Sequence, residues 1–171
     1  MMDVLESIRM KRAVRTFSPD PLSPEIIQTI VQAGRRAQSA KNTQPWHFVA
    51  IQDRDLLHAL SECGTFAGHL AGAALGIAIL TPDPAQRWSI MFDAGQAAAY
   101  MQLAGWSLGV GSCLATIYET EKARQLLAHP SEFHLNVALS FGYPDDEDDL
   151  TRSPRANGRK IMEELIHWET W

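Results

Sequence analysis

The sequence predicts a single α+β domain in which helices pack against a sheet of four separated strands. Four short apolar runs of strand length are spaced along the chain, and segments with helical periodicity lie between them. The length of 171 residues suits one domain with a full hydrophobic core and leaves no room for a second domain of ordinary size. Internal repeats and low-complexity segments are absent from the sequence, so we treat residues 1–171 as one domain.

The first third of the chain is predicted to form two helices, a loop and a strand. The first helix covers residues 3–11, and its apolar face consists of Val4, Leu5 and Ile8. The second begins at Ser23 and Pro24, which suit the N-cap and first helical positions, and it runs to about residue 37. Its buried stripe is expected to contain Ile26, Ile27, Ile30 and Val31. Residues 38–45 lack a period and are expected to be a loop before a strand at 46–51.

The middle of the chain contains the most apolar segments. A short helix is expected at residues 55–62, and the continuous apolar run 74–81 has strand length. His69 precedes this strand and is expected to be a partly buried histidine with its hydrogen bonds satisfied. The longest helix is predicted over about 88–108 and is rich in Ala and Gly, which let another backbone approach closely. It is therefore either a tightly packed core helix or a helix that meets a second copy of the chain.

The last third supplies the remaining two strands and a tail. A third strand is expected at 109–117, a helix at 121–128 and a fourth strand at 135–141. The acidic run 145–149 is expected to be a solvated loop. The tail from about 151 to 171 is polar until a predicted helix at Ile161 to Trp168. Its apolar residues, which also include Trp171, make the tail a candidate for docking on a partner chain.

Composition and motifs exclude several classes of function. The net charge of −5 argues against nucleic acid as the main partner, because phosphate backbones demand a basic face. The most apolar run is too short to cross a bilayer, and the start of the chain lacks the apolar core of a signal peptide, so we expect a cytoplasmic protein without a membrane partner. Cys63 and Cys113 are expected to be buried thiols. No metal-ligand spacing, complete nucleophile elbow or phosphate-binding glycine motif is present.

The cations are concentrated near the two ends of the chain. Eight of the fifteen Lys and Arg residues lie in these two groups, and they are Arg9, Lys11, Arg12, Arg15, Arg152, Arg155, Arg159 and Lys160. Such a distribution is typical either of two solvated basic faces or of one anion site assembled from both ends. The segment 11–17 favours a phosphate, because it carries three cations within five residues and Arg supplies a fork of charge-assisted donors.

Four motifs, in register over nearly the whole chain, resemble those of the nitroreductase family. The family's opening Arg-Arg-Ser-x-Arg-x-Phe is similar to residues 11–17, and its Ser-x-x-Asn-x-Gln-Pro-Trp matches residues 39–46. A third motif, Asp-x-Gly-x-Ala followed by Leu-Ala and Leu-Gly-x-Gly, fits the stretch from Asp93 to Gly111. The fourth, Gly-Arg-x-x-x-Glu-Glu, is found at residues 158–164.

The resemblance implies a mainly antiparallel four-stranded sheet flanked by helices and a homodimer with FMN at the subunit interface. It implies that Lys11, Arg12, Ala13 and Arg15 hold the phosphate, ribityl chain and pyrimidine edge, with Arg159 completing the phosphate site. Residues from the other subunit would line the ring, and these are Gln38, Ser39, Ala40 and Asn42. Leu114, Ala115 and Thr116 would pass beneath the ring, with the backbone N–H near Thr116 facing flavin N5. The partner's C-terminal tail would complete the sheet.

The activity implied by the resemblance is hydride transfer from NAD(P)H through the flavin to a nitroaromatic, a quinone or a similar conjugated small molecule. The resemblance assigns no side chain as an obligatory acid or base. One alternative is a flavoenzyme of another reaction on the same scaffold, such as a dehydrogenase or a dehalogenase. The other is a non-enzymatic dimer with a lost or repurposed flavin site, which is motivated by Ala13 in place of the usual Ser and by Tyr100 in place of a common Asn.

Overall fold

A four-stranded antiparallel sheet forms the centre of the molecule. The computed structural model describes residues 3–154 and 158–171. The strand order is β1-β2-β4-β3, and all three pairs of neighbours are antiparallel. The strands are β1 (His47–Ile51), β2 (Leu75–Thr81), β3 (Gly111–Thr116) and β4 (His134–Gly142). The predicted α+β class and the four predicted strands are confirmed.

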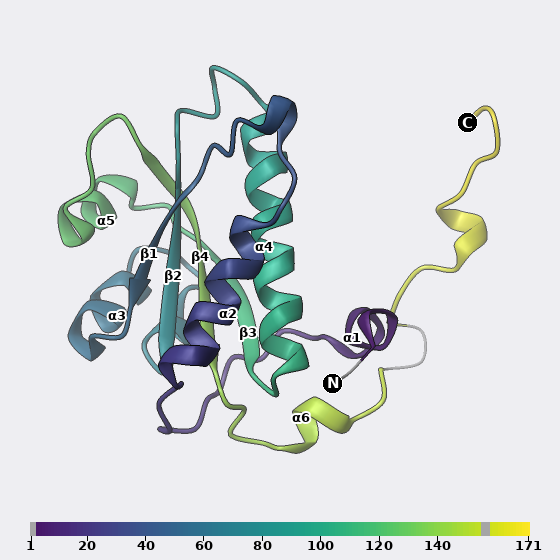
Figure 1. Ribbon diagram of the computed structural model, residues 1–171, viewed down its shortest axis with the longest axis horizontal. Helices are drawn as coiled ribbons and strands as arrows, with labels where there is room; N and C mark the ends of the chain where they lie inside the picture. Colours follow the sequence, from purple (N-terminus) through teal and green to yellow (C-terminus); the bar gives the residue numbers. More distant parts are fainter. Residues whose placement is uncertain (1–2, 155–157) are drawn as a thin grey trace.

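Helices cover both faces of the sheet, as Figure 1 shows. The helices α2 (Pro24–Arg35) and α4 (Ser89–Ser107) lie on one face, and α3 (Arg54–Ser61) and α5 (Thr120–Leu127) lie on the other. Because successive side chains of a strand point to opposite faces, β2 contributes to both cores. Ile77 and Ile79 pack in the cluster beneath α2 and α4, whereas Ala78 packs in the cluster beneath α3 and α5. Burial on both faces explains why β2 is a continuous apolar run.

Local signals in the sequence determine where the helices begin and end. The Ser23 hydroxyl accepts a hydrogen bond from the Ile26 N–H at 3.4 Å, and the Asp53 carboxylate accepts one from the Leu56 N–H at 2.8 Å. The helix α4 ends at Ser107, and the φ of 77° at Gly109 allows the Val110 N–H to reach the Gly105 carbonyl at 2.9 Å. Because this closing turn uses residues 109 and 110, β3 begins at Gly111 rather than at the predicted residue 109.

The N-terminal segment runs from α1 (Val4–Met10) to the edge of β3. The side chains of Met10 and Val14 pack with Trp106 near the end of α4. Beyond α1, the Val14 N–H donates to the Ser112 carbonyl at 3.0 Å, and Ala13 forms a parallel bridge with Ser112. The opposite face of α1 is apolar but exposed, because Val4, Leu5 and Ile8 contact no core of this chain. In α2, Ile30 is fully buried, while the other three residues of the predicted stripe are only partly buried.

Two predictions for the C-terminal third are wrong. The acidic run does not stay a loop, because α6 (Asp148–Thr151) begins where the Asp146 carboxylate accepts from the Asp148 N–H at 3.0 Å. The predicted helix at 161–168 is reduced to a single 3-10 turn, η3 (Met162–Glu164), in a tail that extends away from the body (Figure 1). Short helices are marginal in water without packing, and all residues from 158 to 171 are exposed.

Two further 3-10 turns stand in segments that lead into strands. They are η1 (Ala40–Asn42), within the segment predicted to be a loop, and η2 (Gly68–Leu70), before β2. The buried, free thiols of Cys63 and Cys113 agree with prediction. Among the described residues, no helix is both long and apolar enough to cross a bilayer.

Gly111→Ala should separate the N-terminal segment from β3. A Cβ built on Gly111 would lie 2.7 Å from the Cβ of Val14, and neither the strand nor the buried Val14 has room to move. We expect the free energy of unfolding to fall by about 1–3 kcal/mol, as measured by urea denaturation. The control is Gly72→Ala, whose added Cβ meets no atom within 4 Å. Equal stability of the two variants would contradict the close packing described here.

Candidate functional site

The structure places the N-terminal cations beside β3. Val14 points into the core, whereas Ala13 and Arg15 are exposed and Lys11 is half-buried. Burial lowers the pKa of Lys11, and the nearby Cys113 acts in the opposite direction. Arg12 donates through Nη2 to the carbonyl of Arg152, at the start of the tail, and its buried Nε has no partner among the described residues. Two of the three cations therefore remain available for an anion.

The free edge of β3 carries backbone groups next to these cations. The carbonyl of Ser112 points to the outer edge, where it accepts from Val14, while the Ile117 N–H points inward to the Asn136 carbonyl at 2.9 Å. Because direction alternates along a strand, the backbone groups of Leu114 and Thr116 face the outer edge. The side chains of these two residues are exposed, and that of Ala115 is buried. The structure thus brings Ala13 and Val14 against Gly111 and Ser112, at the start of the strand that continues to residues 114–116. A shared role of residues 11–15 and 114–116 in one site stays a prediction.

The amide-rich loop is held by a buried carboxylate on α4. Asp93 is 3% exposed, and its two oxygens accept from the Ala40 N–H at 3.1 and 3.2 Å. The Ser39 hydroxyl accepts from the Gln44 N–H at 2.9 Å. Lys41 and Asn42 adopt positive φ angles of 53°, so their side chains leave the turn in directions that a regular helix or strand would not give. Asp93 matched a motif in the sequence, but its role as the anchor of this loop became visible only in three dimensions.

A single chain does not bring the loop and the cations together. Met10 and Val14, which flank Lys11 and Arg12 in the sequence, pack on Trp106. The loop is fixed at Asp93, which lies 13 residues earlier in the same helix. At 1.5 Å per residue, these two points are about 20 Å apart. In Figure 1, η1 and α1 accordingly lie at opposite ends of α4. Gln38, Ser39, Ala40 and Asn42 therefore do not meet Lys11 and Arg15 within one copy of the chain.

Arg159 lies in the exposed tail, where its Nη1 donates to the carbonyl of Gly158 at 3.3 Å. The contact between the N-terminal segment and the tail is made through Arg152 instead. Arg155, another cation of the C-terminal group, lies outside the described residues. The convergence of Arg12 and Arg159 on one phosphate therefore stays a prediction.

His69 is a buried polar residue beside this site whose role was not predicted. It lies on η2, is 8% exposed, and its Nδ1 lies 2.7 Å from the Ser140 hydroxyl. The expectation of satisfied hydrogen bonds holds for only half of the ring, because Nε2 is buried and has no partner among the described residues. Burial and, secondarily, the charge of Arg15 lower the pKa of His69, and the Leu114 backbone has the opposite effect.

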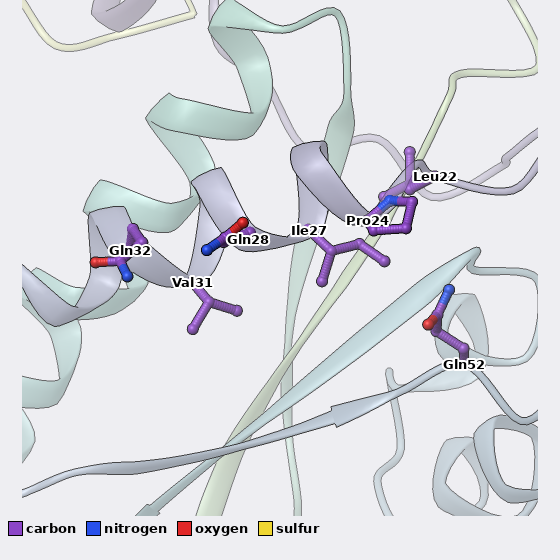
Figure 2. Close-up of a pocket in the computed structure, with 7 residues that line it drawn as sticks. All are labelled: Leu22, Pro24, Ile27, Gln28, Val31, Gln32 and Gln52. Atoms are coloured by element: carbon purple, nitrogen blue, oxygen red, sulfur yellow. The ribbon is translucent and has the colours of Figure 1, made fainter.

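A surface cavity of the single chain lies away from the N-terminal cations and β3. A cavity of about 350 Å³ is formed by α2 and the residue that follows β1, as Figure 2 shows. Its lining consists of Leu22, Pro24, Ile27, Gln28, Val31, Gln32 and Gln52. It contains no charged side chain, so it does not fit a phosphate. In the described part of the chain, no group of three His, Cys, Asp or Glu residues could hold a metal ion.

Comparison with protein families identifies the scaffold. The model of the nitroreductase family matches residues 8–64 and 62–143, which include the cations, the amide-rich loop, Asp93 and β3. The chain belongs to the nitroreductase family. A protein of Archaeoglobus fulgidus, provisionally named an NADH dehydrogenase/NAD(P)H nitroreductase, is 32% identical to this family member over 180 residues, and the alignment covers all of both chains.

Solved structures of the family share the fold over nearly the whole length. A protein of Parabacteroides distasonis with the same provisional name is 25% identical, with a TM-score of 0.86 over 100% of both chains. A protein of Clostridium difficile described as an FMN-dependent nitroreductase is also 25% identical, with a TM-score of 0.86 over 98% of this chain and 99% of its own. This nitroreductase-family chain therefore shares its fold with these two relatives over nearly the whole of each chain.

Replacing Asp93, which holds the amide-rich loop through Ala40, should lower the stability of the protein and loosen this loop. Asp93→Ala leaves the Ala40 N–H without its acceptor in a partly buried place, which should cost about 1–3 kcal/mol of unfolding free energy. Asp93→Asn keeps one oxygen acceptor and should cost less than Asp93→Ala. Hydrogen exchange followed by mass spectrometry should show faster exchange over residues 38–44 in Asp93→Ala. Unchanged exchange in this segment would contradict the assigned role.

Proposed function

We propose that this protein is an FMN-dependent oxidoreductase that passes hydride from NAD(P)H to a nitroaromatic, a quinone or a similar conjugated acceptor. The observation that carries the proposal is the side-by-side position of the Lys11–Arg15 segment and the free edge of β3 in a chain of the nitroreductase family. A flavin supplies the redox chemistry when it is bound, because it exchanges hydride at N5 with donor and acceptor. The Clostridium difficile relative, described as FMN-dependent, supports the choice of cofactor.

The residues at this place fit such a cofactor. Lys11 and Arg15 provide positive charge for a phosphate and for a pyrimidine edge that becomes anionic on reduction. The Thr116 N–H, on the free edge of β3, offers a donor to a ring nitrogen, and the exposed Leu114 side chain offers an apolar contact. Buried groups without partners, the Arg12 Nε and the Ser112 Oγ, lie in the same two segments, as expected where a polar ligand binds.

We expect the purified protein to bind FMN and to lose its yellow absorption on anaerobic addition of NADH or NADPH. Lys11→Gln and Arg15→Gln should each weaken FMN binding about ten- to a hundred-fold, since each removes a charge-assisted contact. The control Lys122→Gln removes a cation that is paired with Glu62 on the α5 side, and it should leave the affinity unchanged. Isothermal titration of the apoprotein measures all three, and absence of FMN binding by the wild type would contradict the proposal.

We further propose that the active form is a homodimer. Large apolar side chains are exposed at the start of α4, including Trp88 at its N-cap (80% exposed) and Phe92 (68% exposed). A Cβ built on Gly95, about one turn beyond Phe92, would meet nothing within 4 Å. A face of this kind suits the close approach of a second helix. A second copy is also the simplest source of the loop that one chain holds about 20 Å away from its own cations.

The tail fits the same arrangement. Its exposed apolar residues include Ile161, Leu165 and Trp168, which in one chain face solvent. The edge strand β1 has no outer neighbour among the described strands, and the apolar cavity between α2 and Gln52 lies beside it (Figure 2). We propose that the tail of one copy docks along this edge of the other and completes the sheet.

Mixing two defective variants tests whether each site is shared between subunits. Arg15→Gln damages the cationic half of a site, and Asn42→Ala damages the loop half. If the halves come from different subunits, a mixed dimer contains one site with both lesions and one intact site. Subunit exchange between equal amounts should therefore restore about a quarter of the wild-type NADH oxidation. No recovery, despite mixed dimers in native mass spectrometry, would show that both halves belong to one chain.

A further inference from the structure

His69 is fixed to the sheet in one orientation. Its Nδ1 lies 2.7 Å from the Ser140 hydroxyl, and that hydroxyl donates its own hydrogen to the carbonyl of Cys113 at 3.4 Å. With the Ser140 hydrogen assigned to this carbonyl, the Ser140 oxygen accepts in the first contact, and Nδ1 carries the ring hydrogen. In the neutral ring, Nε2 is then the basic nitrogen with a free lone pair.

The free lone pair lies beside the proposed flavin site. Nε2 is buried and lacks a partner among the described residues, although buried polar atoms are nearly always hydrogen-bonded. The two neighbours that influence the imidazole are Arg15 and the backbone of Leu114, and both belong to the residues that we assign to FMN. The missing hydrogen bond at Nε2 indicates that this nitrogen gains a partner or a proton when the site binds its ligand or reacts.

The charges around His69 favour its neutral form in the absence of ligand. Arg15 of the N-terminal segment brings positive charge to the imidazole, and Cys113 is the titratable residue of β3 that pairs with Ser140. The elements packed against η2 contribute buried apolar side chains from α3, such as Leu57 and Leu60, and Ser140 from β4. No described carboxylate contributes to the shift in its pKa, which burial and Arg15 lower, so the ring is neutral near pH 7.

We infer that His69 is a proton-holding residue of the proposed flavin site, and that its Nε2 takes up a proton from solvent when the cofactor is reduced. Hydride delivery adds two electrons and one proton, and so leaves one additional negative charge beside Arg15 and His69. A new N–H bond at Nε2 balances that charge. When the hydride passes to the acceptor, this bond breaks and the proton returns to solvent. The inference depends on the proposed function, because it requires FMN at this site.

The underlying reason is thermodynamic linkage between electron and proton binding. An added anionic charge favours the protonated imidazole, and the protonated imidazole favours the reduced cofactor to the same extent. Arg15 alone cannot provide this response, because a guanidinium is protonated in both redox states. Among the residues that we place around the cofactor, His69 has the imidazole that can gain a proton, and the negative charge of the reduced cofactor would raise its lowered pKa.

The direct test is a histidine-resolved NMR titration of the FMN-loaded protein in its oxidised state and after anaerobic reduction with dithionite. His69→Gln identifies the signal that belongs to His69. We expect the pKa of His69 to rise by one unit or more on reduction, which corresponds to about tenfold tighter proton binding. An unchanged pKa in a protein that binds FMN would overturn this inference and leave the proposed function standing. A protein that does not bind FMN would overturn both.

A second measurement does not depend on assigning signals. Proton uptake during reduction can be followed with an indicator dye in weakly buffered solution near neutral pH. His69→Gln should take up fewer protons than the wild type, since glutamine fills the same space without titrating. His58→Gln is the matched control, because His58 lies exposed on α3, and it should leave the uptake unchanged. Equal uptake by His69→Gln and His58→Gln would contradict the inference.

Discussion

The hydrogen bond from Val14 to the Ser112 carbonyl is the contact on which the proposed site depends. It aligns the N-terminal segment with the beginning of β3. In this alignment the side chain of Val14 is buried and that of Arg15 is exposed. The close packing of Val14 on Gly111 leaves the segment no other register. One backbone pairing therefore places both the cations and the backbone donors of the free strand edge.

The long helix α4 divides the site between two places. Its C-terminal end packs against the segment that carries the cations, and its N-terminal half holds the amide-rich loop through Asp93. Because a straight helix keeps these two places about 20 Å apart, each chain presents two separated half-sites. The same helix presents an apolar face between them, which gives a physical reason for association of two copies.

Three of the buried polar atoms that lack a partner among the described residues lie in or near the segments that form the proposed site. These atoms are the Arg12 Nε, the Ser112 Oγ and the His69 Nε2. A stable core normally avoids such groups, since each costs free energy when no partner is present. Departures of this kind are expected where a protein is built to bind a polar ligand.

The sequence by itself determined the elements, and the tertiary structure decided how they meet. Hydrophobic periodicity and capping residues such as Ser23 act over a few positions, so the four strands and the main helices were predictable. The tail helix was predicted wrongly, because its apolar residues form a helix only if something packs on them. The anchoring of Ala40 by Asp93, the separation of the half-sites along α4 and the unpaired Nε2 of His69 join residues far apart in the chain. No local pattern encodes contacts of that kind, so only the folded chain shows them.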